Sequence, residues 1–339
     1  MNQLDLVRDA RKEESTVEPQ DLAHARGALN RAMNEAAQTT RAGARRRRMR
    51  VGIGGVASVG ALAAVAFVAT SVFAPPPSTE NTAAASEVLQ AAADATLTSV
   101  TGVDVPLDDG QYLRIETTLD QVMFNQNIAN PETAAFGLQR DSVLYVPADR
   151  ADDWLLETLP GEVTGVYGVG GQEWLEAVQG ESQTWMNQAT TVAALPGGVE
   201  ASGQPVETYR DQYDEMPRDP QQLLQWFRDA APNGYAGFAI VNALWLNLPP
   251  ADVRAAMLLA LAESGEYALV AQEGDLATLE RVVDADRAGE SRQQFVIDTA
   301  QGLIVQMIDS PEYPAVLNLN QTTMTFTLTV VDEAPAPTQ

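Results

Sequence analysis

The chain contains no cysteine, a single histidine (His24) and a single lysine (Lys12). Without cysteine it has no disulfide, no thiolate metal ligand, no thiol nucleophile and no lipidated cysteine. Because His24 and Lys12 lie within the first 50 residues, the rest of the chain lacks the bases of Ser-His-Asp and Cys-His mechanisms and the imidazoles of zinc sites. We therefore expect no cofactor, no metal, and a fold stabilised by its core alone.

Carboxylates are the remaining source of catalytic chemistry, since the chain has 46 Asp and Glu residues. A glycosidase-type acid pair stays open, but so many acids make any one pair uninformative. The stretch from Asp284 to Asp286 suggests the start of a calcium loop, and Gly289 fits its sixth position. Phe295 stands where the twelfth position needs Glu, so a hairpin turn is the better interpretation. We predict a protein that is not an enzyme.

Positive charge is scarce outside the first 50 residues. The chain has a formal net charge of −25, yet residues 1–50 carry eleven basic and seven acidic side chains, leaving −29 on the remainder. Such an acidic surface repels nucleic-acid phosphates and anionic lipid headgroups. We therefore expect no nucleic-acid partner, and we interpret the acidity as a feature that keeps the domain in solution.

One long uncharged apolar run begins at Val51 and ends at Ala74. Its twenty-four residues are enough to cross a bilayer as a helix, which needs about 20. Arginines before a span keep that end in the cytoplasm. The arginine stop at residues 45–50 precedes the run, and its topology-determining residues are Arg45, Arg46, Arg47, Arg48 and Arg50. The sequence thus predicts a single-pass protein of the cell membrane, with residues 1–50 in the cytoplasm and 75–339 outside.

Two other interpretations of this run stay open. A secretory signal peptide has an apolar run of about 7–15 residues and a short charged head, whereas here the head is fifty residues long. A cut after Ala74 would also precede three prolines, beginning at Pro75. A buried soluble helix would carry an unusual group of five arginines at one end. An uncleaved membrane anchor fits the pattern best.

The cytoplasmic tail, residues 1–44, reads as two helices. In the second, Leu22, Leu29 and Met33 recur at helical spacing and form an apolar stripe. A tail of this size cannot bury that stripe by itself. The stripe is a candidate face for a cytoplasmic partner, with packing on the first helix or on the membrane surface as the alternative.

Beyond the span, we expect a proline-rich linker at 75–85, an α+β domain at 86–331 and a disordered tail at 332–339. The helix after the linker begins at Ser86, a plausible N-cap. Strand patterns follow at 111–117, 142–146, 154–156 and 163–169, and four more lie between 266 and 308. Helices are predicted after Asp219, across 234–248 and after Pro250. Residues 172–215 show no dominant period.

The final strand carries the clearest pattern. Four apolar residues, Met324, Phe326, Leu328 and Val330, alternate there with threonines. Alternation of this kind is typical of an antiparallel sheet with one buried face. Together with the helices, it predicts an α+β domain built on an antiparallel sheet.

Several blocks resemble an uncharacterised family of actinobacterial single-pass membrane proteins, often encoded beside an extracytoplasmic-function sigma factor. In the tail these blocks are LDLVRDAR and EPQDLAHARGAL, followed by the arginine run. After the span they are GQYLRIETT, MPRDPQQLLQWFRDA, PPADVRAAMLLALAES and FVIDTAQGLIVQMID. The resemblance covers most of the chain and implies a shared architecture, with no active-site residues to carry over.

The order of a helix followed by a curved antiparallel sheet also resembles periplasmic lipoprotein carriers and the sensor domains that regulate envelope-stress sigma factors. By that analogy the outer domain is a half-barrel with packed helices. Two hypotheses follow. The chain is a sensor or regulator whose tail holds a sigma factor, or it is a tethered module whose outer domain binds a lipid or lipoprotein acyl chain.

Overall fold

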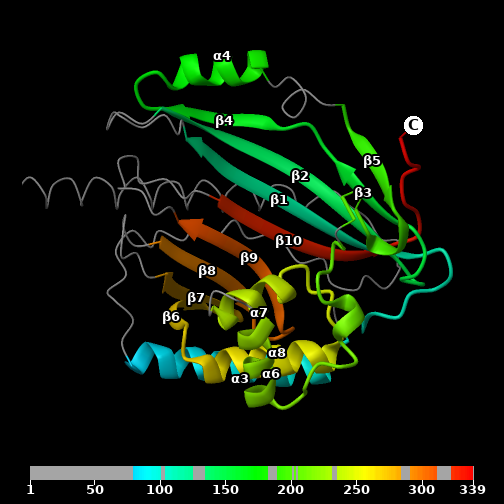
Figure 1. Cartoon of the computed structure of the whole chain (residues 1–339), viewed down its shortest axis with the longest axis vertical. Helices are drawn as coiled ribbons and strands as arrows, with labels where there is room; N and C mark the ends of the chain where they lie inside the picture. The colour runs from blue at the N-terminus through cyan, green and yellow to red at the C-terminus, as the bar shows by residue number, and fades with distance from the viewer. Residues whose placement is uncertain are drawn as a thin grey trace, which may run out of the picture. The chain divides into compact units, whose positions relative to one another are not determined.

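The structure is a computed structural model (Figure 1). It describes residues 79–100, 104–124, 134–181, 189–200, 202–203, 205–230, 235–283, 291–310 and 322–338. All of these belong to one compact unit, Leu62–Gln339. The description below concerns this unit.

One curved antiparallel sheet organises the described residues, which confirms the α+β class and its antiparallel sheet (Figure 1). Its strand order is β5-β3-β2-β1-β10-β9-β8-β7-β6, and β4 also pairs with β2. The first strands are β1 (Tyr112–Phe124), β2 (Ala135–Pro147), β3 (Trp154–Thr158), β4 (Glu162–Tyr167) and β5 (Thr191–Leu195). The others are β6 (Ala268–Glu273), β7 (Leu276–Val283), β8 (Ser291–Asp298), β9 (Leu303–Ser310) and β10 (Thr322–Val331).

The last strand joins the two halves of the sheet. β10 pairs with β1, with Ile115 opposite Leu328, and on its other edge it pairs with β9. Because β1 lies near the start of the domain and β10 near its end, closing this pair ties distant parts of the chain together. The alternation predicted for this strand is seen in its burial, since Phe326 lies in the main core and Leu328 packs against it.

Alternation gives strand β1 an apolar and a polar side. In β1, Leu113 and Ile115 are buried in the main core. The alternating residues Arg114 and Glu116 form an ion pair with each other at 2.7 Å. Successive side chains of a strand point to opposite faces, so the two pairs mark the two sides. The apolar side, which carries the helices, is called the concave face below.

Four helices cover part of the concave face. They are α3 (Thr79–Thr98), α6 (Pro220–Ala230), α7 (Ala236–Leu244) and α8 (Ala251–Ser264). α8 is the central helix of the group, since it packs against α3, α6 and α7. Its Val253, Met257 and Leu261, which recur every four residues, are all buried.

A fifth helix, α4 (Gly171–Glu181), forms a separate small core with β2. There Leu175 packs with Phe136 and Leu138. By strand alternation these β2 residues lie on the same face as Leu144, which belongs to the main core. The concave face is therefore covered at both ends of β2, by the main helices and by α4.

The first helix differs from the sequence prediction. α3 begins at Thr79, so seven residues of the expected linker at 75–85 are helical. Ser86 is consequently not an N-cap but an interior residue, whose hydroxyl donates to the carbonyls of Thr82 and Ala262. The alanines of this stretch explain the earlier start, because alanine has the highest helix propensity and Ala85 packs into the core.

The helices after residue 219 largely confirm the prediction. Asp219 caps α6, its carboxylate accepting a hydrogen bond from the Gln222 amide at 3.0 Å. The apolar stretch at 234–248 is helical only from Ala236 to Leu244. Asn247 follows it with a positive φ of 55° and exchanges two hydrogen bonds of 2.8 Å with the Ile304 backbone. This amide ties the connection between α7 and α8 to the start of β9.

The C-terminal segment also differs from the prediction of a disordered tail at 332–339. Residues 332–338 have no regular secondary structure, but Thr338 pairs with β5. Its amide donates to the Val192 carbonyl at 2.9 Å, and its hydroxyl accepts from the Val192 amide at 2.5 Å. These bonds satisfy backbone groups on an edge strand that would otherwise face water.

Candidate functional site

The region without a sequence period contains a buried polar cluster centred on Glu207. It belongs to the segment that connects the short turns η2 (Pro196–Gly198) and η3 (Arg210–Gln212). Glu207 is 6% exposed, and the Tyr213 hydroxyl donates to its Oε1 at 2.6 Å. A carboxylate is rarely buried unless it is paired, so its surroundings decide what the cluster can do.

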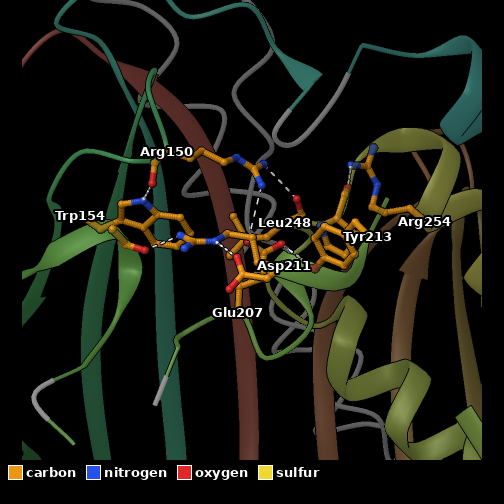
Figure 2. Close-up of polar contacts among 10 residues, drawn as sticks. Arg150, Trp154, Glu207, Asp211, Tyr213, Leu248 and Arg254 are labelled. Carbon is orange, nitrogen blue, oxygen red and sulfur yellow. Dashed lines mark hydrogen bonds and ion pairs between the residues drawn. The ribbon is translucent and has the colours of Figure 1, made fainter. Parts of the chain in front are cut away.

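Arg150 provides the cationic partner. Its Nη1 lies 3.5 Å from Glu207 Oε2, and its Nη2 donates to the Leu248 carbonyl at 3.0 Å (Figure 2). The Arg150 carbonyl in turn accepts from the Trp154 indole at 3.1 Å. The cluster thus joins the start of β3, the 205–213 segment and the connection before α8.

A second arginine closes the cluster on the other side. Arg210 donates to the Gly197 carbonyl, pairs with Asp211 at 3.4 Å and lies 5.8 Å from the centre of the Trp154 ring. Its contacts hold η3 against η2. Arginine suits this role because a planar guanidinium can hydrogen-bond and stack on an aromatic ring at the same time.

Burial shifts the ionisation of the cluster. Desolvation raises the pKa of Glu207, and it outweighs the Tyr213 hydrogen bond and the charges of Arg150 and Arg210, which act in the opposite direction. The pKa of Tyr213 is raised as well, by burial and then by the neighbouring Glu207 charge. Tyr213 therefore stays a neutral hydrogen-bond donor at any physiological pH.

A neighbouring arginine anchors α8. Arg254 is fully buried; its Nη1 donates to the Pro249 carbonyl at 2.7 Å, and its Nη2 lies 2.9 Å from the Asp104 carboxylate. Burial lowers the pKa of Arg254, and the Asp104 charge opposes that shift. With the Glu207 cluster, this pair fixes the connections that precede β3 and α8. We interpret both as structural networks, because no described group among them is an activated nucleophile.

A different feature of the concave face is a row of apolar residues that crosses six strands. Residues directly opposite one another on neighbouring strands share a face. Following the pairing from β6 to β1 gives an apolar row, called the apolar ladder below: Leu269, Leu279, Phe295, Met307, Met324 and Leu119. Phe295 is 1% exposed beneath the helices, whereas Met324 and Leu119 are only half-buried. The ladder therefore runs from the core into a partly uncovered stretch of sheet.

The next row along the same strands is polar. This polar ladder consists of Arg281, Gln293, Asp309, Thr322 and Gln121, one residue each from β7, β8, β9, β10 and β1. Arg281 donates to Gln293 Oε1 at 2.7 Å, and Gln293 hydrogen-bonds Asp309. An apolar row bordered by hydrogen-bonding groups is compatible with an amphipathic ligand.

The two ladders meet α7 at a small recess. Its walls include Phe238 and Val241 from α7, Tyr267 before β6, and the ladder residues Phe295 and Asp309. The Tyr267 and Phe295 rings contact edge to face, with centroids 5.1 Å apart. A second small recess lies beside Glu207 and the end of α7.

The candidate site residues that the sequence singled out are not among those that the structure describes. The five arginines at 45–50, the run from Val51 to Ala74 and the stripe of Leu22, Leu29 and Met33 are outside the described residues, as are Asp284 and Asp286. In the part of the chain that the structure describes, no helix has the length and apolarity needed to cross a membrane. The predicted topology and partner face therefore remain predictions.

Comparison with known proteins gives no family. Neither a scan against protein-family models nor a search of curated proteins finds a match for this chain. Functional inference therefore rests on the sequence and on the geometry of the described residues.

Sequence reasoning did not single out Glu207 or Asp309. Glu207 belongs to a stretch without period, so no local pattern marks its burial. Asp309 could have been found: it follows Met307 by two residues in a strand, and alternation puts both on the apolar face. An acid at such a position is a signal worth examining.

Proposed function

We propose that the protein is a non-enzymatic, membrane-anchored sensor or regulator of the cell envelope. The tail at 1–44 would contact a cytoplasmic partner, with a sigma factor as the candidate, and the run from Val51 to Ala74 would cross the membrane. The α+β domain would then bind a ligand outside. The observation that supports the binding role is the apolar ladder, which leaves the core and continues onto half-buried strands at Met324 and Leu119.

The ladder also favours a particular kind of ligand. Half-buried apolar side chains on β10 and β1 gain stability when an apolar group removes them from water, at about 25 cal/mol for each Å² covered. A half-barrel resembling lipoprotein carriers would use its concave face in this way, although likeness of fold by itself says little about function. The alternative function, a tethered lipid- or lipoprotein-binding module, rests on the same ladder.

The cytoplasmic half of the proposal is tested by affinity capture of the full chain from membranes. We expect a sigma factor to co-purify with the natural chain. It should be lost when Leu22, Leu29 and Met33 are all changed to glutamate, because the charges destroy the apolar stripe. Glu35→Gln, off that stripe, is the control and should retain the partner. Absence of any sigma factor from the natural sample would contradict the regulatory role and leave the binding module.

The outer half is tested by native mass spectrometry of the full chain released from detergent. We expect an added mass in the lipid range. Leu119→Arg should remove this added mass by placing a charge in the apolar ladder. Thr118→Arg is the control and should retain it, because Thr118 precedes Leu119 and lies on the opposite face of β1. Bare protein in all three samples, or equal loss in both variants, would contradict ligand binding on the concave face.

A further inference from the structure

The two edge strands of the sheet differ in how they are protected. At one end, β6 carries Glu273 and packs against α3. At the other end, β5 has the sequence Thr-Val-Ala-Ala-Leu, which contains no charged residue and no proline. An edge strand presents unpaired backbone groups to any other strand, so natural proteins add charges or prolines there or cover the edge. The protection of β5 therefore has to come from outside the strand.

Residues 332–338, called the strap below, supply this protection. The strap leaves β10 and ends beside β5 (Figure 1). The Thr338 amide donates to the Val192 carbonyl at 2.9 Å, and the Thr338 hydroxyl accepts from the Val192 amide at 2.5 Å. A residue of an added antiparallel strand makes the same pair of bonds, one to each backbone group. Thr338 thus occupies the place that an added strand would take.

The strap also contacts an apolar patch on the face opposite the helices. Four buried residues form this patch: Val143 and Tyr145 of β2, Leu155 of β3 and Val192 of β5. The two β2 residues alternate with residues of the main core, so they lie on the other side of the sheet. Ala334 of the strap packs against the patch. Release of the strap would uncover apolar side chains next to the unprotected edge.

Few contacts hold the strap in place. Besides those above, its hydrogen bond to other described residues runs from the Gln111 side chain to the Asp332 carboxylate at 2.8 Å, at the surface. The side chains of Glu333, Ala336 and Pro337 are exposed. A segment with few buried contacts opens at a free-energy cost well below that of global unfolding. The strap can therefore leave β5 while the sheet stays folded.

We propose that the strap is an autoinhibitory contact that prevents two copies of this chain from associating through β5. When the strap leaves, β5 of one copy pairs with β5 of the other, since a two-fold contact brings identical strands together in antiparallel directions. The uncharged sequence of β5 suits this partner, because pairing with itself places no like charges opposite one another. The apolar patches of the two copies then flank the new strand pair. This role does not depend on the ligand proposed for the concave face.

The test compares the full chain with a shortened chain that ends at Val331, by native mass spectrometry after release from detergent. We expect the shortened chain to form dimers at protein concentrations at which the full chain does not. Adding Ala193→Lys, at an exposed position of β5, should return the shortened chain to the monomer mass. Ala271→Lys, at an exposed position of the opposite edge strand β6, is the matched control and should leave the dimer intact.

A second variant tests the contact without shortening the chain. Thr338→Pro removes both the amide donor and the hydroxyl that bind Val192, so it should also increase the dimer fraction of the full chain. A synthetic peptide of residues 332–339, added in excess, should reduce the dimer fraction of the shortened chain. Thermal unfolding of each variant checks the fold, and if the shortened chain does not fold, Thr338→Pro decides the question.

Two outcomes would overturn the proposal. One is an equal dimer fraction in the full chain and in the folded variants that lack the strap contact. The other is a dimer that survives Ala193→Lys as well as it survives Ala271→Lys, which would place the association elsewhere. The lipid-range mass expected above should be the same in all these chains, so failure of the association test leaves the proposed ligand binding unaffected.

Discussion

Burial controls the ionisation of both acids that matter in this domain. For Glu207 and for Asp309, desolvation raises the pKa despite nearby arginines and hydrogen-bond donors. Glu207 pairs with Arg150 and accepts from the Tyr213 hydroxyl, whereas Asp309 accepts a hydrogen bond from Gln293. Each acid also lines a small recess. We assign a structural role to Glu207, because the cluster around it joins three chain segments.

Glu207 predicts a specific dependence of stability on pH. Its pKa is raised in the folded chain above the ordinary value of 4.5. The folded state thus binds the proton more tightly than the unfolded state. The resulting stabilisation is fully present below pH 4.5 and is lost as the pH rises through the raised pKa. Glu207→Gln removes this titration while its amide oxygen still accepts from Tyr213.

The measurement is urea unfolding of both forms from about pH 4 to pH 7, a window set by the ordinary carboxyl range. We expect the free energy of unfolding of the natural chain to fall relative to that of Glu207→Gln as pH increases. All other groups titrate equally in the two chains and cancel. Parallel profiles would show that Glu207 has the same pKa folded and unfolded.

At the scale of elements, strands and turns were easier to predict than helix ends. The pattern at 323–330 fixed β10 because alternation reports which side chains the sheet buries. Asp219 and Pro220 fixed the start of α6 through capping chemistry. The start of α3 at Thr79 reflects the helix propensity of its alanines, together with the packing of Ala85 into the core. The C-terminal segment depended on pairing with β5, and such a tertiary contact leaves no local pattern.

The turn at 298–302, between β8 and β9, gives an element-scale test. Gly302 ends it with φ +66°, and a Cβ there would clash with the Thr96 side chain and lie 2.5 Å from the Ala92 carbonyl of α3. Gly302→Ala combines left-handed strain with overpacking, so we expect a loss of about 2–5 kcal/mol in unfolding free energy.

Gly274 in the β6–β7 turn is a matched control for this test. It has φ +60° and open space around its Cα, so Gly274→Ala should cost only the left-handed strain, about 1–2 kcal/mol. Urea unfolding compares the two variants. Equal losses would show that the hairpin does not pack against α3 as described.

At the scale of the whole molecule, charge and hydropathy separate a basic tail, an apolar run and an acidic α+β domain. The sequence predicted the class of that domain, and the structure confirms the curved antiparallel sheet with helices on its concave face (Figure 1). It could not predict the ladders, because they require the register of six strands at once. The proposed sensor requires the tail and the α+β domain to lie on opposite sides of one membrane, which the apolar run would cross.

The absence of cysteine allows that topology to be measured directly. A single cysteine is introduced in the outer domain by Asp109→Cys, at an exposed position, or in the tail by Ala37→Cys. Intact cells or spheroplasts are treated with a membrane-impermeant maleimide. We predict immediate labelling at position 109 and labelling at position 37 only after permeabilisation. Protection of position 109 in intact cells, with labelling only after lysis, would contradict a membrane-anchored domain outside the cytoplasm.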